Sequence, residues 1–107
     1  MSVQDIVENK LNARLNDPQE GPEMRELNAV FQFNLSGDET GNWFVDLKEG
    51  KAGAGDHASP DCTVSMDSSD FIDLYNGDTQ GAMLFMSGRL QIEGDMGLAL
   101  KLGELMG

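Results

Sequence analysis

The side chains best suited to chemistry lie together in one short segment of this 107-residue chain. His57 and Cys62 stand five positions apart, with Asp56 and Asp61 beside them, in "GDHASPDC". A cysteine–histidine pair can form an activated thiolate nucleophile, and all four side chains are potential metal ligands. However, the flanking Gly, Ala, Ser and Pro indicate a loop without a scaffold for the pair, and the spacing matches no zinc pattern. The segment therefore predicts neither a catalytic site nor a metal site.

Other acidic and glycine-rich segments are equally incomplete. "DETGN" and "DSSD" lack the full ligand series of an EF-hand loop. Gly94 and Gly97 are not followed by the Lys-Ser/Thr pair of a phosphate-binding loop. We therefore expect a protein that is not an enzyme and that uses no cofactor.

The charge of the chain excludes one class of partner. Nineteen acidic and seven basic residues give a formal net charge of −12. Nucleic-acid binding needs a basic surface, so we expect no nucleic-acid partner. Anionic bilayers would also be repelled, although transient contact with a membrane stays open.

The length predicts one domain, residues 1–107. The single Cys62 fits a reducing compartment, and the first residues lack the basic start and apolar block of a signal peptide. The longest apolar run, Ala82 to Met86, is too short to span a bilayer. A cytoplasmic location is the resulting expectation.

Hydrophobic periodicity predicts both helices and strands. Helical spacing predicts a helix over 2–15, a helical turn near 22–27, helices over 67–77 and 79–88, and a last helix over 96–106. The apolar residues of the first helix are Val3, Ile6, Val7, Leu11 and Leu15. Asp67 is the expected N-cap of the helix over 67–77, completed by Asp70, with Gly77 at its C-cap, and Thr79 is expected to open the next helix. Alternation of apolar and polar residues predicts strands at 29–36, 43–48 and 62–66, a weak edge strand near 51–55, and a final strand over 89–93. The first three clear strands suit an antiparallel meander with one buried face.

Two features of the predicted helices leave alternatives open. The last helix is apolar around roughly twice the ~100° arc that a helix on a sheet needs, so it is deeply buried, packs in an oligomer, or walls a cavity. Lys10 and Arg14 point within the apolar arc of the first helix. Either their stems lie along the edge of the core, or they meet a headgroup at the mouth of a cavity.

Three motifs together resemble one known family. "MSGRLQIEGDMGLALKL" (86–102) closely resembles the carboxy-terminal signature of sterol carrier protein domains, a strand that leads through Gly-[Asn/Asp]-Met into a leucine-rich helix. "NWFVDLKEGK" (42–51) is similar to a hairpin of that family, and "PDCTVSMDSSDFIDLYNG" (60–77) to its next strand and helix. The motifs occur in the order of the family, from about Leu27 to Leu102.

The resemblance implies an α+β fold: a five-stranded, mostly antiparallel sheet with helices on one face, enclosing a hydrophobic tunnel. It also implies a non-catalytic function, the binding and intracellular transfer or presentation of sterols, fatty acids or acyl-CoA. The strong acidity departs from the family and argues against acyl-CoA phosphates as ligands. The alternative is a protein-interaction or accessory module in lipid or quinone metabolism, which docks through the exposed apolar last helix and whose oligomeric state is open.

The tunnel lining is predicted from the inward positions of the strands and helices, among which methionines suit an adaptable wall but are also common as core filling. The candidates are Phe33, Trp43, Val45, Phe71, Leu74, Phe85, Leu90, Ile92, Met96, Leu98, Leu102 and Met106, with Lys10 and Arg14 as headgroup candidates.

Overall fold

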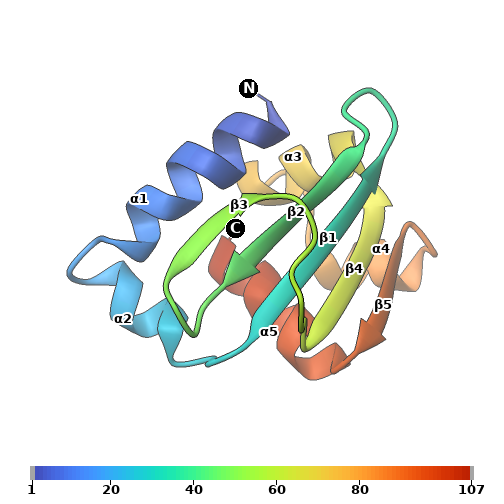
Figure 1. Cartoon of the computed structure of the whole chain (residues 1–107). Coiled ribbons are helices and arrows are strands. Elements are labelled where there is room, and N and C mark those ends of the chain that lie inside the picture. The colour runs from blue at the N-terminus through green and yellow to red at the C-terminus, as the bar shows by residue number, and fades with distance from the viewer. Residues whose placement is uncertain (1, 107) are drawn as a thin grey trace.

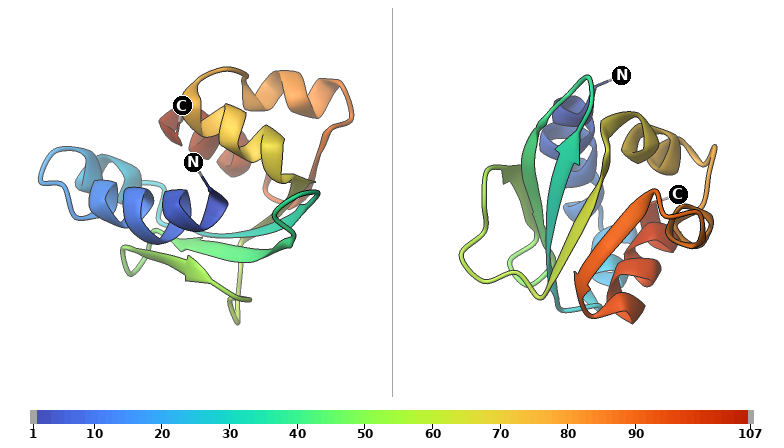
Figure 2. Two further views of the ribbon diagram at one scale, coloured as in Figure 1. Left: turned by 90° about the horizontal axis from the view of Figure 1, so that it is seen from above. Right: turned by 90° about the vertical axis from the view of Figure 1, so that its right-hand side faces the viewer.

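The chain folds into a sheet with helices on one of its faces (Figure 1, Figure 2). The structure, a computed structural model, describes residues 2–106, the last four by their backbone alone. The strands are β1 (Val30–Ser36), β2 (Gly41–Asp46), β3 (Lys51–Ala54), β4 (Cys62–Asp67) and β5 (Leu90–Gly94). They form one sheet in the order β3-β2-β1-β4-β5, which confirms the predicted five-stranded sheet.

One pair of strands is parallel and the others are antiparallel. β1, β2 and β3 form an antiparallel meander, and β5 runs antiparallel to β4. The meander predicted for the strands at 29–36, 43–48 and 62–66 is therefore wrong in its third strand. β4 lies parallel to β1 because the segment 55–61 carries the chain from the β3 edge to the far side of β1. The sheet is therefore mixed and mostly antiparallel, as expected.

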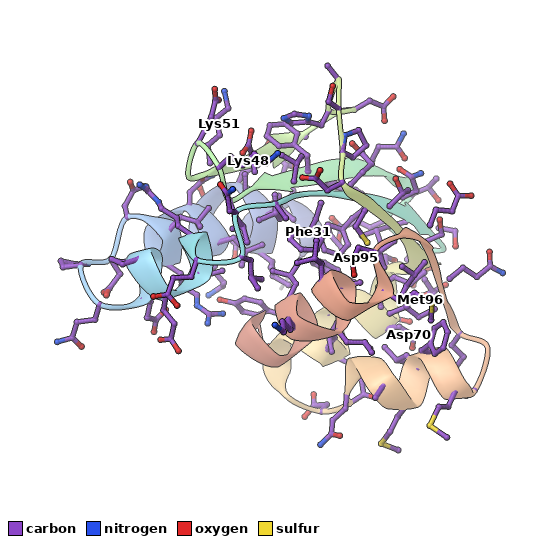
Figure 3. All side chains as sticks on the ribbon, turned by 90° about the horizontal axis from the view of Figure 1, so that it is seen from below. Phe31, Lys48, Lys51, Asp70, Asp95 and Met96 are labelled. Carbon is purple, nitrogen blue, oxygen red and sulfur yellow. The ribbon has the colours of Figure 1, made fainter. Side chains whose placement is uncertain are left out.

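The alternation of side chains gives the sheet one apolar face. Trp43, Phe33, Val64 and Ile92 pair across four neighbouring strands and form one continuous row on that face. Phe31, on the next inward position of β1, is fully buried between the sheet and the helices (Figure 3). This face is the side that the helices cover (Figure 2).

Two groups of helices divide the apolar face between them. η1 (Asp5–Leu11), a π-helix, continues into α1 (Asn12–Leu15) and packs over β2 and β3, followed by α2 (Glu20–Arg25). α3 (Ser68–Asn76), α4 (Gly81–Met86) and α5 (Met96–Met106) lie over β4 and β5. The five apolar residues predicted for the first helix are all buried: Val3, Ile6, Val7, Leu11 and Leu15.

Local signals place the helix ends, with two corrections. Asp67 caps α3 by accepting the Ser69 N–H at 2.8 Å, and Gly77 ends that helix at φ +79°, as predicted. Thr79 was expected to open the next helix, but α4 begins at Gly81 without a side-chain cap. Asp70 was expected to complete the Asp67 cap. It pairs with Arg89 instead, because the turn after α4 brings that guanidinium to Asp70 with N–O distances of 2.7 and 3.1 Å.

The turn between β5 and α5 depends on a glycine. Gly94 has a φ of +98°, and a Cβ there would lie 2.5 Å from the Asp61 carbonyl oxygen. Any other residue would therefore be both strained and too close. Within residues 2–106, no helix combines the length and the apolar character needed to cross a bilayer.

Replacing Phe71 by alanine should lower the free energy of unfolding by about 3–5 kcal/mol. The Phe71 ring is fully buried and packs edge-on against Phe33, with ring centroids 5.2 Å apart. Urea unfolding followed by circular dichroism measures the change. Met83→Ala is the control, because Met83 is 63% exposed, and it should stay within about 0.5 kcal/mol of the parent. Similar losses in both variants would contradict the assignment of Phe71 to the core.

Candidate functional site

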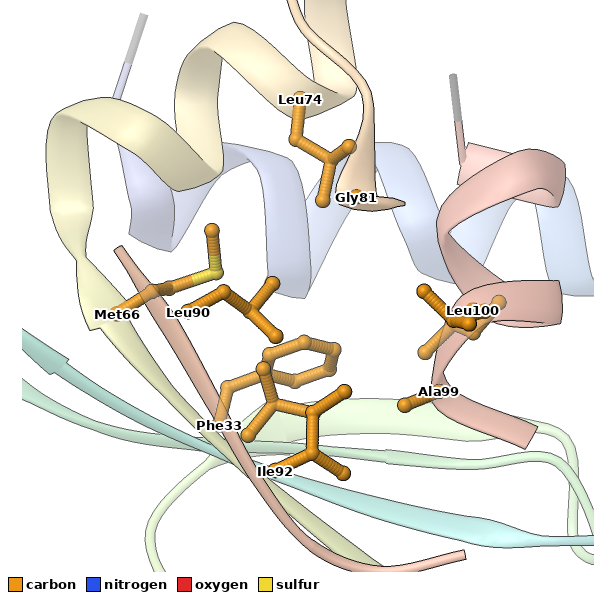
Figure 4. A pocket seen from close by; sticks show the side chains of 10 residues that line it. Phe33, Met66, Leu74, Gly81, Leu90, Ile92, Ala99 and Leu100 are labelled. Carbon is orange, nitrogen blue, oxygen red and sulfur yellow. The ribbon is translucent and has the colours of Figure 1, made fainter. Parts of the chain in front are cut away.

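An apolar cavity lies between the sheet and the helices of the carboxy-terminal half (Figure 4). Its floor comes from β1, β4 and β5, and α3, the start of α4 and α5 surround the rest. The lining residues are Phe33, Val64, Met66, Leu74, Gly81, Leu90, Ile92, Ala99, Leu100 and Leu102.

Strand register and small side chains create this space. Val64 pairs with Ile92 and Met66 with Leu90, so the inward positions of β4 and β5 lie side by side. Above them, Gly81 has no side chain and Ala99 carries only a methyl group, and both face the gap (Figure 4).

The cavity is narrow. The centres of water-sized molecules have about 20 Å³ in it, and all the space not filled by atoms, including the part open to solvent, is about 350 Å³. A single water needs roughly 10–15 Å³ measured in this way, whereas ligand sites commonly have about 300–1,000 Å³. The structure thus has an apolar cavity where the tunnel was expected, but without room for a whole acyl chain.

The predicted lining residues fall into three groups. Some lie around the cavity: Phe33, Leu74, Leu90, Ile92 and Leu102. Others lie elsewhere in the core or at its edge: Trp43, Val45 and Phe71 are buried and Leu98 is half-buried. Phe85 and Met96 are exposed, and the Met106 side chain lies outside the described residues.

Five lining residues were missed from the sequence: Val64, Met66, Gly81, Ala99 and Leu100. Val64 and Met66 stand at alternate positions of the strand predicted over 62–66, so a register for β4 beside β5 would have selected them. Gly81 and Ala99 carry no such signal, because small residues contribute to a cavity by leaving space. Leu100 lies on the broad apolar arc of α5, where periodicity does not separate the cavity side from the solvent side.

The two headgroup candidates lie on the first helix. The Arg14 Nε donates to a Glu20 carboxylate oxygen at 2.8 Å, and the guanidinium lies 5.9 Å from the centroid of the Tyr75 ring on α3. Lys10 is half-buried one turn earlier. Neither residue belongs to the cavity lining, but Arg14 contacts the helix that contributes Leu74 to it.

The histidine and the cysteine that open the sequence analysis lie on opposite faces of the sheet. The His57 Nε2 is 3.0 Å from an Asp46 carboxylate oxygen, on the face that the helices do not cover, and its backbone N–H donates to Gln32 at 2.7 Å. Cys62 points to the helix side, where burial, with help from the Asp95 and Asp61 charges, raises the pKa of its thiol to about 11. The two side chains therefore do not form a nucleophilic pair. Among the described residues, no group of three or more His, Cys, Asp or Glu could hold a metal ion.

A polar hollow of about 500 Å³ lies where β4 ends and β5 begins. Serine hydroxyls and the side chains of Asp67, Asp70, Arg89 and Gln91 line it. Asp70 is buried and accepts two hydrogen bonds from Arg89, so these two opposite charges pair with each other. This arrangement braces α3 against the start of β5.

Comparisons with known proteins agree with this architecture. The model of the SCP-2 sterol transfer family matches residues 8–107. Hydroxysteroid dehydrogenase-like protein 2 from Xenopus tropicalis is 49% identical over 87 residues, which cover 78% of this chain and 21% of that protein. The chain thus spans about a fifth of the length of the curated relatives that it matches.

Solved structures show the same fold. The solution structure of palmitated SCP2L2 from Aedes aegypti is 31% identical, covers 99% of this chain and 95% of that one, and has a TM-score of 0.77. Sterol carrier protein 2 from Yarrowia lipolytica in its apo form has a TM-score of 0.80 at 24% identity, covering 97% of this chain and 86% of that one. At that identity, the second likeness supports the fold alone.

Alkylation of Cys62 by iodoacetamide at pH 8 should be at least about 100-fold slower in the folded protein than in urea. A pKa near 11 leaves far less thiolate than the ordinary thiol pKa of about 8.5, and burial blocks access as well. Mass spectrometry of timed samples measures both rates. Equal rates would show that the thiol is accessible and that its pKa is not raised.

Acid should destabilise the protein in part through Asp46. Burial raises the pKa of its carboxyl, but the Glu49 and Lys48 backbone N–H groups and the His57 ring outweigh that effect, so the pKa lies below its usual value. The resulting stability is complete above the ordinary pKa of about 3.9 and is lost as the pH falls through the lower folded value. Asp46→Asn should therefore flatten the decline of unfolding free energy below about pH 4, measured by urea unfolding. The same replacement at exposed Asp73 serves as the control, and an equal effect there would refute the role of Asp46.

Proposed function

Because the chain belongs to the SCP-2 sterol transfer family, we propose that it binds an apolar lipid between its sheet and α3, α4 and α5. It then carries the lipid, or presents it to a membrane or an enzyme, without catalysing a reaction itself. The observation that carries this proposal is the cavity, whose lining residues are all apolar. The palmitated SCP2L2 of Aedes aegypti, at 31% identity, supports a lipid as the ligand.

Binding requires the cavity to expand, because about 20 Å³ holds no acyl chain. α5 is the element best suited to move. Leu98, Ala99 and Leu100 on this helix are only half-buried, whereas the apolar residues of η1 and α1 are almost completely buried. We propose that α5 shifts away from β5 and that the lipid takes over the contacts of its inner side.

The energetic gain suits reversible binding. Burying ten methylenes at about 0.8 kcal/mol each gives about 8 kcal/mol before the costs of association. That value corresponds at best to a micromolar dissociation constant. A carrier with such an affinity can keep a lipid out of water and still release it.

Sterols and fatty acids fit this site better than acyl-CoA, whose phosphates would meet a protein with a net charge of −12. Arg14 stays the candidate to donate a hydrogen bond to a headgroup oxygen, since it lies over Tyr75 beside the α3 wall. The match covers only about a fifth of the relatives named dehydrogenase-like, so presentation to a separate catalytic unit belongs to the proposal. A cytoplasmic setting stays a prediction from the sequence.

A second candidate function is docking on another protein. Among the side chains that the structure describes, the large apolar ones exposed on the surface lie on α4 and at the start of α5: Met83, Phe85, Met86 and Met96. This surface thus includes α4 beside the start of the carboxy-terminal helix. Self-association without lipid uptake, measured by light scattering over a range of concentrations, would favour this function.

Replacing Ala99 by phenylalanine should weaken lipid binding at least about tenfold, because the ring would occupy the space between α5 and the sheet. Titration of a fluorescent fatty acid in 0.5 M NaCl measures the affinity and should give one site per chain for the parent protein. Ala82→Phe makes the same change at an exposed position of α4 and should leave the affinity within twofold.

Far-UV circular dichroism of both variants must match that of the parent protein. Unchanged binding in a folded Ala99→Phe variant would place the lipid elsewhere. Absence of binding by the parent protein would contradict the lipid function itself.

A further inference from the structure

The two edge strands of the sheet differ in how they are covered. At the β3 edge, the Asn12 side chain of the first helix donates to the Ala52 carbonyl at 2.7 Å and accepts from the Ala52 N–H at 2.8 Å. It thereby takes both hydrogen bonds that a further strand would make at this residue. At the other edge, β5 lies nearest the viewer in the right panel of Figure 2, with no described helix or strand in front of it. β5 is therefore the open edge of the sheet.

The strand register determines which backbone groups face this open edge. Along a strand, the N–H and C=O groups of successive residues point alternately to its two neighbours. The Val30 carbonyl accepts the Asp61 N–H, so Asp61 and every second residue after it point to β1. The residues between them point to β5, where their partner Ile92 points back. This alternation turns the backbone groups of Gln91 and Glu93 to the open edge.

The sequence at this edge is complementary to itself. When "RLQIE" (89–93) is paired antiparallel with a second copy so that Gln91 lies opposite Gln91, each Arg89 lies opposite Glu93 of the other copy. Opposite charges that face each other across a strand pair stabilise it, whereas like charges destabilise it. A register centred on Glu93 would bring two carboxylates together. The charges thus favour one antiparallel register with two equivalent ion pairs.

The side chains required for this pairing are accessible. Gln91 and Glu93 are exposed, and the Arg89 side chain is 61% exposed although its Nε and Nη2 donate to Asp70. Three of the five guanidinium N–H groups remain for a second carboxylate, so the buried Asp70 keeps its partner.

Apolar surface borders the same edge. α4 and α5 both contact β5 and flank it on the helix side (Figure 2). Met86, on α4, is 85% exposed, and Met96, at the start of α5, is 42% exposed. Strand pairing at β5 would bring these side chains toward the second copy, where burial of their apolar area adds to the backbone hydrogen bonds.

We propose that β5 pairs antiparallel with β5 of a second copy of this chain, about a two-fold axis at Gln91, so that the two sheets become continuous. This association goes beyond the proposed lipid function and does not depend on it. Each copy carries a net charge of −12, and the resulting repulsion opposes the contact. The dimer is therefore weak and reversible, and added salt strengthens it by screening the repulsion.

Sedimentation velocity of the purified chain over micromolar to millimolar concentrations, in buffer with 150 mM NaCl at pH 7.5, measures the association. We expect a reversible monomer–dimer equilibrium. Glu93→Arg places two guanidinium groups opposite each other and should weaken the dimer at least about tenfold. Glu23→Arg makes the same change of net charge at an exposed position of α2 and should leave the dimer unchanged or slightly stronger. Because both variants reduce the net repulsion, a loss in Glu93→Arg alone reports the local contact.

Cross-linking locates the interface. Cys62 is buried and the pKa of its thiol is raised to about 11, so an introduced surface cysteine reacts first. With a short bis-maleimide, Gln91→Cys should form covalent dimers at least about tenfold faster than Lys51→Cys, which places an exposed thiol on the β3 edge.

Three results would overturn the inference. A parent protein that stays monomeric over the whole concentration range would contradict the dimer. A dimer that Glu93→Arg leaves intact, or that Glu23→Arg weakens equally, would not be formed through β5. Cross-linking of Lys51→Cys as fast as that of Gln91→Cys would also exclude β5 as the preferred edge.

Discussion

The need to cover one wide apolar face governs this structure. A five-stranded sheet with regular alternation presents a face broader than one helix can shield, and water must be excluded from all of it. η1 and α1 cover the part over β2 and β3 with side chains that are almost completely buried. Over β4 and β5 the cover consists of α3, α4 and α5, and the cavity shows that their fit to the sheet is incomplete. The cavity is a direct result of that difference.

A site that the helices cover incompletely can bind a ligand at a low cost in free energy. Where packing is tight, as around Phe31 and Phe71, a guest would have to displace contacts that stabilise the fold. Where a helix is held by half-buried side chains, a guest can replace those contacts with similar ones of its own. The exchange then costs little, which is consistent with a carrier that must both load and unload. The polar pairs at the rim, such as Arg89 with Asp70, remain intact during such an exchange because they lie outside the lining.

The elements were predictable from the sequence because their signals are local. Alternation identified the strands, Asp67 and Gly77 marked the ends of α3, and the spacing of apolar residues identified the first helix. Contacts between distant segments were not predictable in this way. Asp70 was assigned to a cap because its actual partner, Arg89, is 19 positions away. The lining was partly missed for a related reason: Phe33 and Phe71 are both buried aromatic residues, and only the three-dimensional packing shows that Phe33 borders the gap.

The parallel pairing of β1 with β4 affects how the chain reaches this fold. Phe31 is paired with Cys62, 31 positions later, so β1 keeps one edge open while β2, β3 and the segment 55–61 are being made. That edge is apolar on its inner side and offers unpaired backbone groups, features that attract strands of other chains. A nascent chain that stalls before β4 is consequently a hazard for aggregation. When β4 pairs with β1, it completes the centre of the sheet and covers the unpaired edge of β1.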